Sequence, residues 1–214
     1  GTTDYELALD LAVDNLGRAH IGGYSDATLD LQTVLPQSVT PVQSLPGGLG
    51  DGLYLVINPN LTGPQSLVYA SYVGGVFADE IWGVDVDNQN AGYLAGMTAS
   101  GDFASLNSTF PFSGATDGFA TRIRPLGNGA SDLMYSVFVG GGGFDRAFGI
   151  AVDRATRDAF VCGTAETGQS SDSWCVRLLS NGWLVSGDLF GDVAQFDMAI
   201  SVCCAQGGNY IGVC

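Results

Sequence analysis

The sequence contains no lysine, a single histidine and only three glutamates among 22 acidic residues. Seven arginines leave a net charge of −15 at neutral pH. A chain this acidic repels the phosphates of nucleic acids and of anionic lipids, so we expect neither as a partner. Because aspartate favours turns whereas glutamate favours helices, the excess of aspartate indicates β-structure with many turns.

Long apolar runs and metal-binding cysteine spacings are also missing. No stretch of about 18 apolar residues occurs, so we predict no membrane insertion. None of the five cysteines lies in a CxxC pattern, and zinc or c-type haem sites are therefore not expected. No signal peptide is visible, and the chain begins at Gly1 as a processed chain or a fragment of a longer one would.

Glycine, by contrast, is abundant, with 32 residues that often stand in pairs or longer clusters. The clusters follow no three-residue period, which excludes collagen. Hydrophobic residues make up 46% of the chain, which is enough to fold around a core. Glycine clusters between apolar runs indicate short strands joined by tight turns.

Four strand-like segments recur along the chain in a fixed order. The first alternates apolar with small or polar residues and reads LAVD, VDVD, IAVD and ISVC in successive copies. A second segment ends in glycine, a third begins with aspartate, and a fourth closes before glycine. These repeats divide one domain, residues 1–214, into units 1–75, 76–143 and 144–192 and a partial unit 193–214.

Four strands in each repeated unit are typical of a β-propeller blade. We therefore predict an all-β fold, a β-propeller-like array of four-stranded blades with three full units and a C-terminal hairpin. A β-sandwich, which also has short strands at even spacing, is the alternative.

The motifs GIAVD, AFVCG and LVYASYVGG resemble the bacterial β-propeller repeats known as SBBP repeats. In that family an AVD–turn–YVTG hairpin is followed by DAFVAKLNPDG and LVYSTYLGG segments. Asn58-Pro59 and Arg124-Pro125 stand where the family has its Asn-Pro turn, whereas the third unit lacks that proline and ends in Gly191-Asp192. The resemblance implies a blade scaffold in a large secreted or surface protein and names no activity.

The predicted strands do not complete a ring, because the partial unit 193–214 lacks a third and a fourth strand. Three arrangements remain open. The chain is a segment of a longer ring, or the hairpin packs on the first unit as a small irregular propeller, or a neighbouring subunit completes the open edge. Completion by neighbours without ring closure would build a fibre.

The cysteines favour disulfides over reduced thiols in a secreted chain. Cys162 and Cys175 flank one loop on neighbouring predicted strands, where a cross-strand disulfide is geometrically reasonable.

The remaining three cysteines allow two interpretations. A two-residue turn at Gly208-Asn209 would place Cys203 opposite Cys214, whereas alignment with the earlier repeats keeps these two apart. We prefer a bond from Cys203 or Cys204 to Cys214. One thiol then remains, either buried or in an intersubunit disulfide.

No set of residues points to catalysis. His20 lies within an alternating segment and no GxSxG motif accompanies it, so we expect a structural or surface histidine. Glutamate is rare and no carboxylate pair stands out for glycoside hydrolysis. We therefore predict that the protein is not an enzyme.

No cofactor is expected. The many acidic residues make calcium the one cation to consider. The segment 85–90 begins like a calcium loop but lacks the glycine and glutamate that complete one, so we interpret it as a strand ending in a turn. The aspartates that head the third segments or precede the first segments are expected to accept hydrogen bonds from turn backbone. They are Asp51, Asp117, Asp172, Asp79, Asp145 and Asp197.

Two further features concern the surface. Asn60 and Asn107 stand in N-glycosylation sequons near predicted turns. The long inserts, residues 24–50 and 97–116, are loops of the kind that bind partners on a rigid scaffold.

Together these features predict a non-enzymatic extracellular structural or surface protein. We expect a self-assembling fibre or surface-layer subunit, or an adhesin segment, that uses open blade edges for contacts between subunits. Its expected partners are copies of itself, in a homo-oligomer or head-to-tail polymer, and a glycan or cell-surface polymer. The alternative is a glycan- or calcium-binding propeller module of a larger secreted protein.

Overall fold

The predicted all-β fold is confirmed. The computed structural model describes residues 4–166, 170–190, 196–204 and 210–213, the last four as a strand only. Three antiparallel four-stranded sheets and one two-stranded hairpin account for the strands of this part of the chain, which contains no α-helix.

Each sheet uses four consecutive strands in chain order. The first sheet contains β1 (Glu6–Val13), β2 (Ala19–Ser25), β3 (Asp51–Ile57) and β4 (Leu67–Val73). The second contains β5 (Asp79–Val86), β6 (Gly92–Thr98), β7 (Asp117–Ile123) and β8 (Leu133–Val139). The third contains β9 (Asp145–Val152), β10 (Ala159–Glu166), β11 (Ser171–Leu178) and β12 (Leu184–Phe190), and the hairpin contains β13 (Val202–Cys204) and β14 (Tyr210–Val213).

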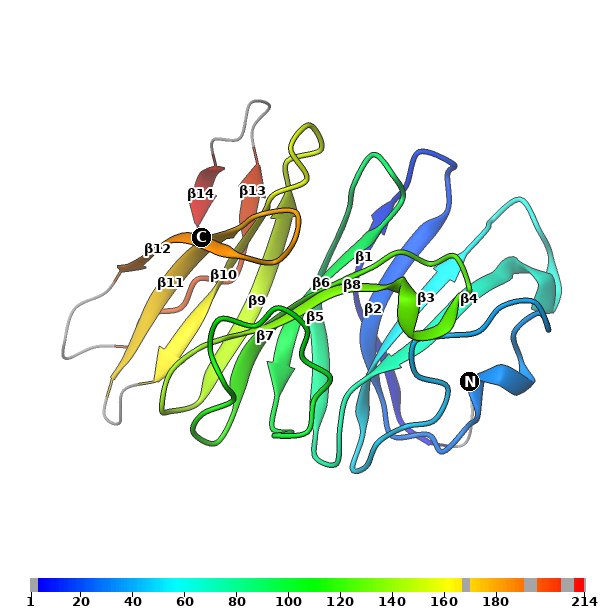
Figure 1. Cartoon of the computed structure of the whole chain (residues 1–214), viewed down its shortest axis with the longest axis horizontal. Helices are drawn as coiled ribbons and strands as arrows, with labels where there is room; N and C mark the ends of the chain where they lie inside the picture. The colour runs from blue at the N-terminus through cyan, green and yellow to red at the C-terminus, as the bar shows by residue number, and fades with distance from the viewer. Residues whose placement is uncertain (1–3, 167–169, 191–195, 205–209, 214) are drawn as a thin grey trace.

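The sheets stand in a row, with the first sheet and the hairpin at opposite ends (Figure 1). The first strand of each unit packs on the preceding sheet: β5 lies against β1, β2 and β3, and β9 lies against β5, β6 and β7. The hairpin lies on β9 and β10. The arrangement in which the hairpin packs on the first unit is therefore wrong.

The apolar core lies between neighbouring sheets. Tyr54 of the first sheet packs with Ile81, Leu94 and Phe119 of the second, and all four side chains are fully buried. A second cluster joins the second and third sheets and contains Tyr93, Tyr135, Val161 and Trp174. Burying a large apolar side chain contributes about 1.5–3 kcal/mol, so these contacts explain why the sheets stack.

Every complete unit has a β-bulge in its first strand. The extra residues are Leu9, Trp82 and Phe148, at the register shifts of β1, β5 and β9. A glycine of the second strand lies against the bulge in each case, because a Cβ there would collide with the carbonyl oxygen of Leu7, Glu80 or Arg146. The rings of Trp82 and Phe148 stack across two sheets with centroids 4.7 Å apart.

The start of the partial unit matches the earlier units in a register that differs from the prediction by two residues. The backbone N–H of Asp197 donates to Ser171 as that of Asp145 donates to Thr116. Counting from these aspartates, Cys203 corresponds to Ala151 and not to the aspartate that ends the first segment of the third unit. The predicted match of ISVC with IAVD is therefore wrong.

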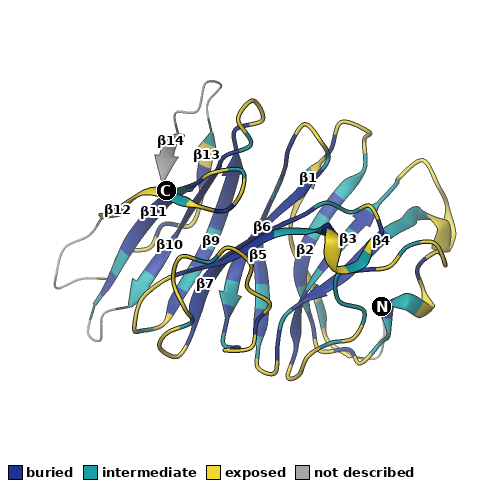
Figure 2. Ribbon diagram, viewed as in Figure 1, coloured by how far each residue is buried: buried dark blue, intermediate teal, exposed yellow. Residues whose placement is uncertain are grey.

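The two long inserts lie along the outer strands of their own sheets. Gln43 accepts a hydrogen bond from the backbone of Tyr72 in β4, and Leu106 exchanges two backbone hydrogen bonds with Ser136 in β8. The inserts thus cover edges that would otherwise pair with other chains. The third unit has a much shorter connection at this place, and β12 at the end of the row is mostly exposed (Figure 2).

Candidate functional site

One end of each sheet, where the first strand turns into the second, buries a carboxylate beside a cationic side chain. We call these ends the arginine rim. In the first unit, Asp14 accepts hydrogen bonds from Nε of Arg18 at 2.7 Å and from Nε2 of His20 at 3.1 Å.

The next two units repeat the arrangement with arginine from the third strand. Arg122 donates to Asp87 at 2.6 Å, and both side chains are buried. Arg177 donates to Asp158 at 2.6 Å in the third unit. Arg122 and Arg177 stand at the same repeat position, which is the one sequence signal that could have indicated these pairs. Asp87 also accepts hydrogen bonds from backbone N–H groups of its turn, as expected for segment 85–90.

His20 is a structural histidine. Its side chain is fully buried, and its second ring nitrogen lies 2.6 Å from the hydroxyl of Tyr54. Burial lowers the pKa of His20, so the ring stays neutral at physiological pH. Burial alone would raise the pKa of Asp14, but hydrogen bonds from Arg18 and His20 outweigh it and hold this pKa below its usual value.

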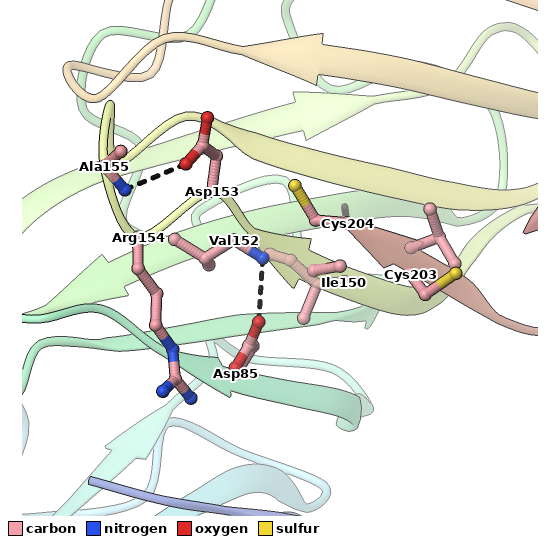
Figure 3. Close-up of a pocket in the computed structure, with 10 residues that line it drawn as sticks. Asp85, Ile150, Val152, Asp153, Arg154, Ala155, Cys203 and Cys204 are labelled. Atoms are coloured by element: carbon pink, nitrogen blue, oxygen red, sulfur yellow. Dashed lines mark hydrogen bonds between the residues drawn. The ribbon is translucent and has the colours of Figure 1, made fainter. Parts of the chain in front are cut away.

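A hollow of about 720 Å³ lies along β5, β9 and β13 (Figure 3). Asp85 accepts a hydrogen bond from the backbone N–H of Val152 at 2.7 Å, as Asp10 does from Val84 at 2.8 Å. The first bond satisfies a backbone donor of β9 beside the hollow, and the second does the same for β5 at the preceding junction. Burial raises the pKa of Asp85.

Cys204 is the candidate nucleophile of this hollow and is poorly suited to the role. Burial, together with the negative charges of Asp153 and Asp85, raises the pKa of its thiol. A protonated thiol is a weak nucleophile, and the single histidine of the chain lies buried in the first unit.

Metal-binding clusters and membrane-spanning helices are both missing from the part of the chain that the structure describes. Across these ranges, no three His, Cys, Asp or Glu side chains gather as a metal site would require. The same residues include no helix that could cross a bilayer.

The cysteine predictions are corrected in part. Cys162 and Cys175 lie directly opposite each other on β10 and β11, but no disulfide joins Cys162, Cys175, Cys203 and Cys204 to one another. The first two thiols are instead packed into the apolar contact with the hairpin, where Cys162 lies 3.6 Å from the carbonyl oxygen of Ala199. Burial raises the pKa of Cys175 to about 11.

The hairpin has a different register from the one that pairs Cys203 with Cys214. Val202 lies opposite Val213, and Cys204 lies opposite Tyr210. Cys214 and the turn at Gly208-Asn209 are outside the described residues.

Both glycosylation candidates are exposed, in a turn for Asn60 and in a loop for Asn107. The side-chain amide of Asn107 donates a hydrogen bond to the carbonyl oxygen of Asn181 at 3.2 Å, so a glycan on this nitrogen would compete with that contact. Asn60 donates a hydrogen bond from its backbone N–H to the side chain of Asn58. Its own side chain lies exposed at the turn, where a glycan would not displace that bond.

The opposite ends of the sheets carry the aspartates that head the third strands and the following first strands. We call these ends the carboxylate rim. Asp51 and Asp79 accept hydrogen bonds from the backbone N–H groups of Gly47 at 2.8 Å and Gly75 at 2.7 Å. The predicted role in turns is confirmed for this pair.

The next junction has the same arrangement. Asp117 accepts a hydrogen bond from the backbone of Ser113 at 2.7 Å, and Asp145 accepts one from Gly141. In the third unit, Asp172 and Asp197 are half-buried, and the backbone of Asp197 donates to Ser171.

The outer face of the first sheet carries apolar side chains that no other sheet covers. Leu11 is 59% exposed, whereas Val84 and Ile150, at the same repeat position, are 5% and 7% exposed. The face is hollowed by about 430 Å³ and is lined by side chains from all four strands and from the first insert. Leu31 and Leu35 of that insert cover part of the face and are themselves buried.

Comparison of the sequence with protein-family models finds no matching family, and comparison with curated proteins finds no similar sequence. The resemblance to SBBP repeats therefore stays a prediction from the motifs.

Proposed function

We propose that the protein is a non-enzymatic extracellular structural subunit that extends by head-to-tail contact between copies. In this proposal the sheets are blades of a radial, propeller-like array, and a second copy supplies the sheet that would precede β1–β4. The assembly forms a fibre, a surface layer or the stalk of an adhesin.

The exposure of Leu11 carries the proposal. The same repeat position is buried wherever another sheet precedes it, so the first sheet presents a face whose side chains match an interface between sheets. Exposed apolar patches of this kind mark sites of protein contact. The occupant that fits is another sheet of the same type, because the chain already builds two such junctions from its own units.

The outer strand of the third sheet, near the hairpin end of the row, offers a second exposed apolar surface. Trp183 and Leu189 are 61% and 70% exposed on and beside β12. Because β12 is the outermost strand of its sheet, a neighbouring copy could contact both the apolar strip and the strand edge there. The acidic, lysine-free composition is compatible with a saline, extracellular setting.

The experiment compares two leucines of equal exposure. Leu11→Asp places a charge on the outer face of the first sheet, and Leu126→Asp places one on a loop, where Leu126 is also 59% exposed. We expect the wild type and L126D to associate with rising concentration in light scattering and to form elongated particles in electron microscopy. We expect L11D to associate about tenfold more weakly or worse.

A wild type that stays monomeric up to roughly 100 µM would contradict the proposal, as that concentration exceeds the Kd of most specific interfaces. Equal association of the two variants would contradict it as well, because the contact would then not use this face.

A further inference from the structure

The carboxylate rim brings two aspartates of consecutive units to one point. A Cβ on Gly74 would collide with Oδ1 of Asp51 and would lie 2.8 Å from Oδ2 of Asp79. At the next junction, a Cβ on Gly140 would lie 2.8 Å from Oδ1 of Asp117 and 2.7 Å from Oδ2 of Asp145. Only glycine therefore allows the two carboxylates to approach the backbone this closely at each junction.

All four carboxylates are buried, and three of them are incompletely satisfied; both oxygens of Asp145 accept backbone hydrogen bonds, from Glu166 and Gly141. Asp51, Asp79 and Asp117 are at most 1% exposed, yet Oδ1 of each lacks a hydrogen-bond partner in the described structure. A buried oxygen that carries charge and meets no donor is costly. Asp132 shows how the same chain satisfies a buried carboxylate without a cation, since its Oδ2 accepts three backbone hydrogen bonds.

Among the described residues, no arginine forms an ion pair with these aspartates. At the arginine rim, by contrast, Asp14, Asp87 and Asp158 pair with Arg18, Arg122 and Arg177, and Asp153 is the buried aspartate there that keeps an oxygen without a partner in the described structure. At the carboxylate rim the nearby guanidinium of Arg146 pairs with Glu166 at 3.3 Å. Asp102 adds a further negative charge beside the first pair, where it accepts a hydrogen bond from the backbone of Val76.

We propose that each of these pairs, Asp51 with Asp79 and Asp117 with Asp145, binds a calcium ion. Calcium accepts six to eight oxygen ligands in flexible geometry and takes carboxylates, main-chain carbonyls and water together. Two carboxylates supply part of that set, so main-chain oxygens and water complete it. The chain charge of −15 concentrates cations around the protein.

A bound ion would connect consecutive sheets, because each pair takes one aspartate from each of two units. Sites with few charged ligands bind calcium with Kd values on the order of 10⁻⁴–10⁻³ M, which suits extracellular calcium.

Calorimetry on the full chain tests the inference. At neutral pH we expect calcium to bind with a stoichiometry of about two per chain, and about 5 mM calcium to raise the melting temperature by at least about 4 °C. Magnesium should bind more weakly, because it demands octahedral geometry and loses water reluctantly. The double variant Asp51→Asn with Asp117→Asn should lose both effects, and Asp188→Asn, an exposed aspartate of β12, should keep them.

Three results would overturn the inference. The first is a folded wild type that shows neither heat of binding nor a shift in melting temperature with calcium. The second is a double variant that binds calcium as the wild type does. The third is a protein that calcium leaves unchanged and that becomes more stable as the pH falls towards 5 in chelator, which would mean that each pair shares a proton. Terbium luminescence on the wild type, displaced by calcium, provides a readout if the variants do not fold. Assembly does not enter these measurements, so their failure leaves the proposed function standing.

Discussion

At the arginine rim, Asp87 lies 2.6 Å from Arg122, whereas at the carboxylate rim Asp51 faces Asp79 across Gly74. Both rims bury aspartates, and both repeat with the units. They differ in which carboxylates have an arginine partner. At the arginine rim Asp14, Asp87 and Asp158 each pair with an arginine, although Oδ2 of Asp153 there has no partner in the described structure. At the carboxylate rim Oδ1 of Asp51, Asp79 and Asp117 has none. In the calcium inference, the arginine rim is therefore stabilised by side chains of the protein itself, whereas the carboxylate rim depends on cations from the solution.

Removal of the cation at the arginine rim should have the largest effect. Arg122→Met leaves Asp87 buried without its partner, so we expect a loss of about 3–5 kcal/mol in the free energy of unfolding, measured with urea. The double variant Arg122→Met with Asp87→Asn should recover part of that loss. A loss below about 1 kcal/mol would show that water reaches Asp87 and that the rims are alike.

The histidine of the arginine rim predicts a dependence on pH. Because the pKa of His20 is lower in the folded state than its ordinary value of about 6.5, the unfolded chain binds more protons as the pH falls below that value. The contribution of neutral His20 to the free energy of unfolding is therefore complete above about pH 6.5 and is lost as the pH falls towards the folded pKa.

The variant His20→Phe, which carries the residue found at this position of the third unit as Phe160, should be less sensitive to acid between about pH 7 and 5. Tyr135→Phe retains the histidine with both of its hydrogen bonds, and it serves as the control. Urea unfolding at several pH values measures both. Equal slopes for His20→Phe and the wild type would contradict the assignment.

The arginine of the carboxylate rim should matter least. The side chains of Arg146 and Glu166 are 31% and 34% exposed and lie 3.3 Å apart. Exposed ion pairs contribute little, so Arg146→Gln should change the free energy of unfolding by less than about 0.5 kcal/mol. A change comparable to that of Arg122→Met would mean that Arg146 compensates the aspartates of its rim.

The sequence indicates the strands and units well, because four motifs recur with the alternation that half-buried strands need. It does not define the register of the last unit. A shift of two residues preserves the inward and outward alternation of a strand, so ISVC matched IAVD equally well in the wrong frame. The two alignments are separated by a tertiary contact, the backbone hydrogen bond from Asp197 to Ser171.

The candidate sites were less accessible to sequence reasoning. The aspartates at Asp51 and Asp79 were expected to satisfy turn backbone, and they do. Their proximity could not be predicted, because it arises from the packing of one sheet on the next. The disulfide expected between Cys162 and Cys175 rests on the adjacency of their strands, and that adjacency is correct. Their packing against the hairpin could not be predicted, because it depends on a segment more than 20 residues further along the chain.

The bulge residue of each first strand and the glycine that lies against it on the second strand should evolve together. A side chain at Gly23, Gly96 or Gly163 would collide with a backbone carbonyl, and only deletion of the bulge residue would remove the obstacle. Neither change is tolerated alone, so relatives of this protein should keep both features or lose both. Such covariation would identify diverged copies of this repeat even after the Ala-Val-Asp motif has disappeared.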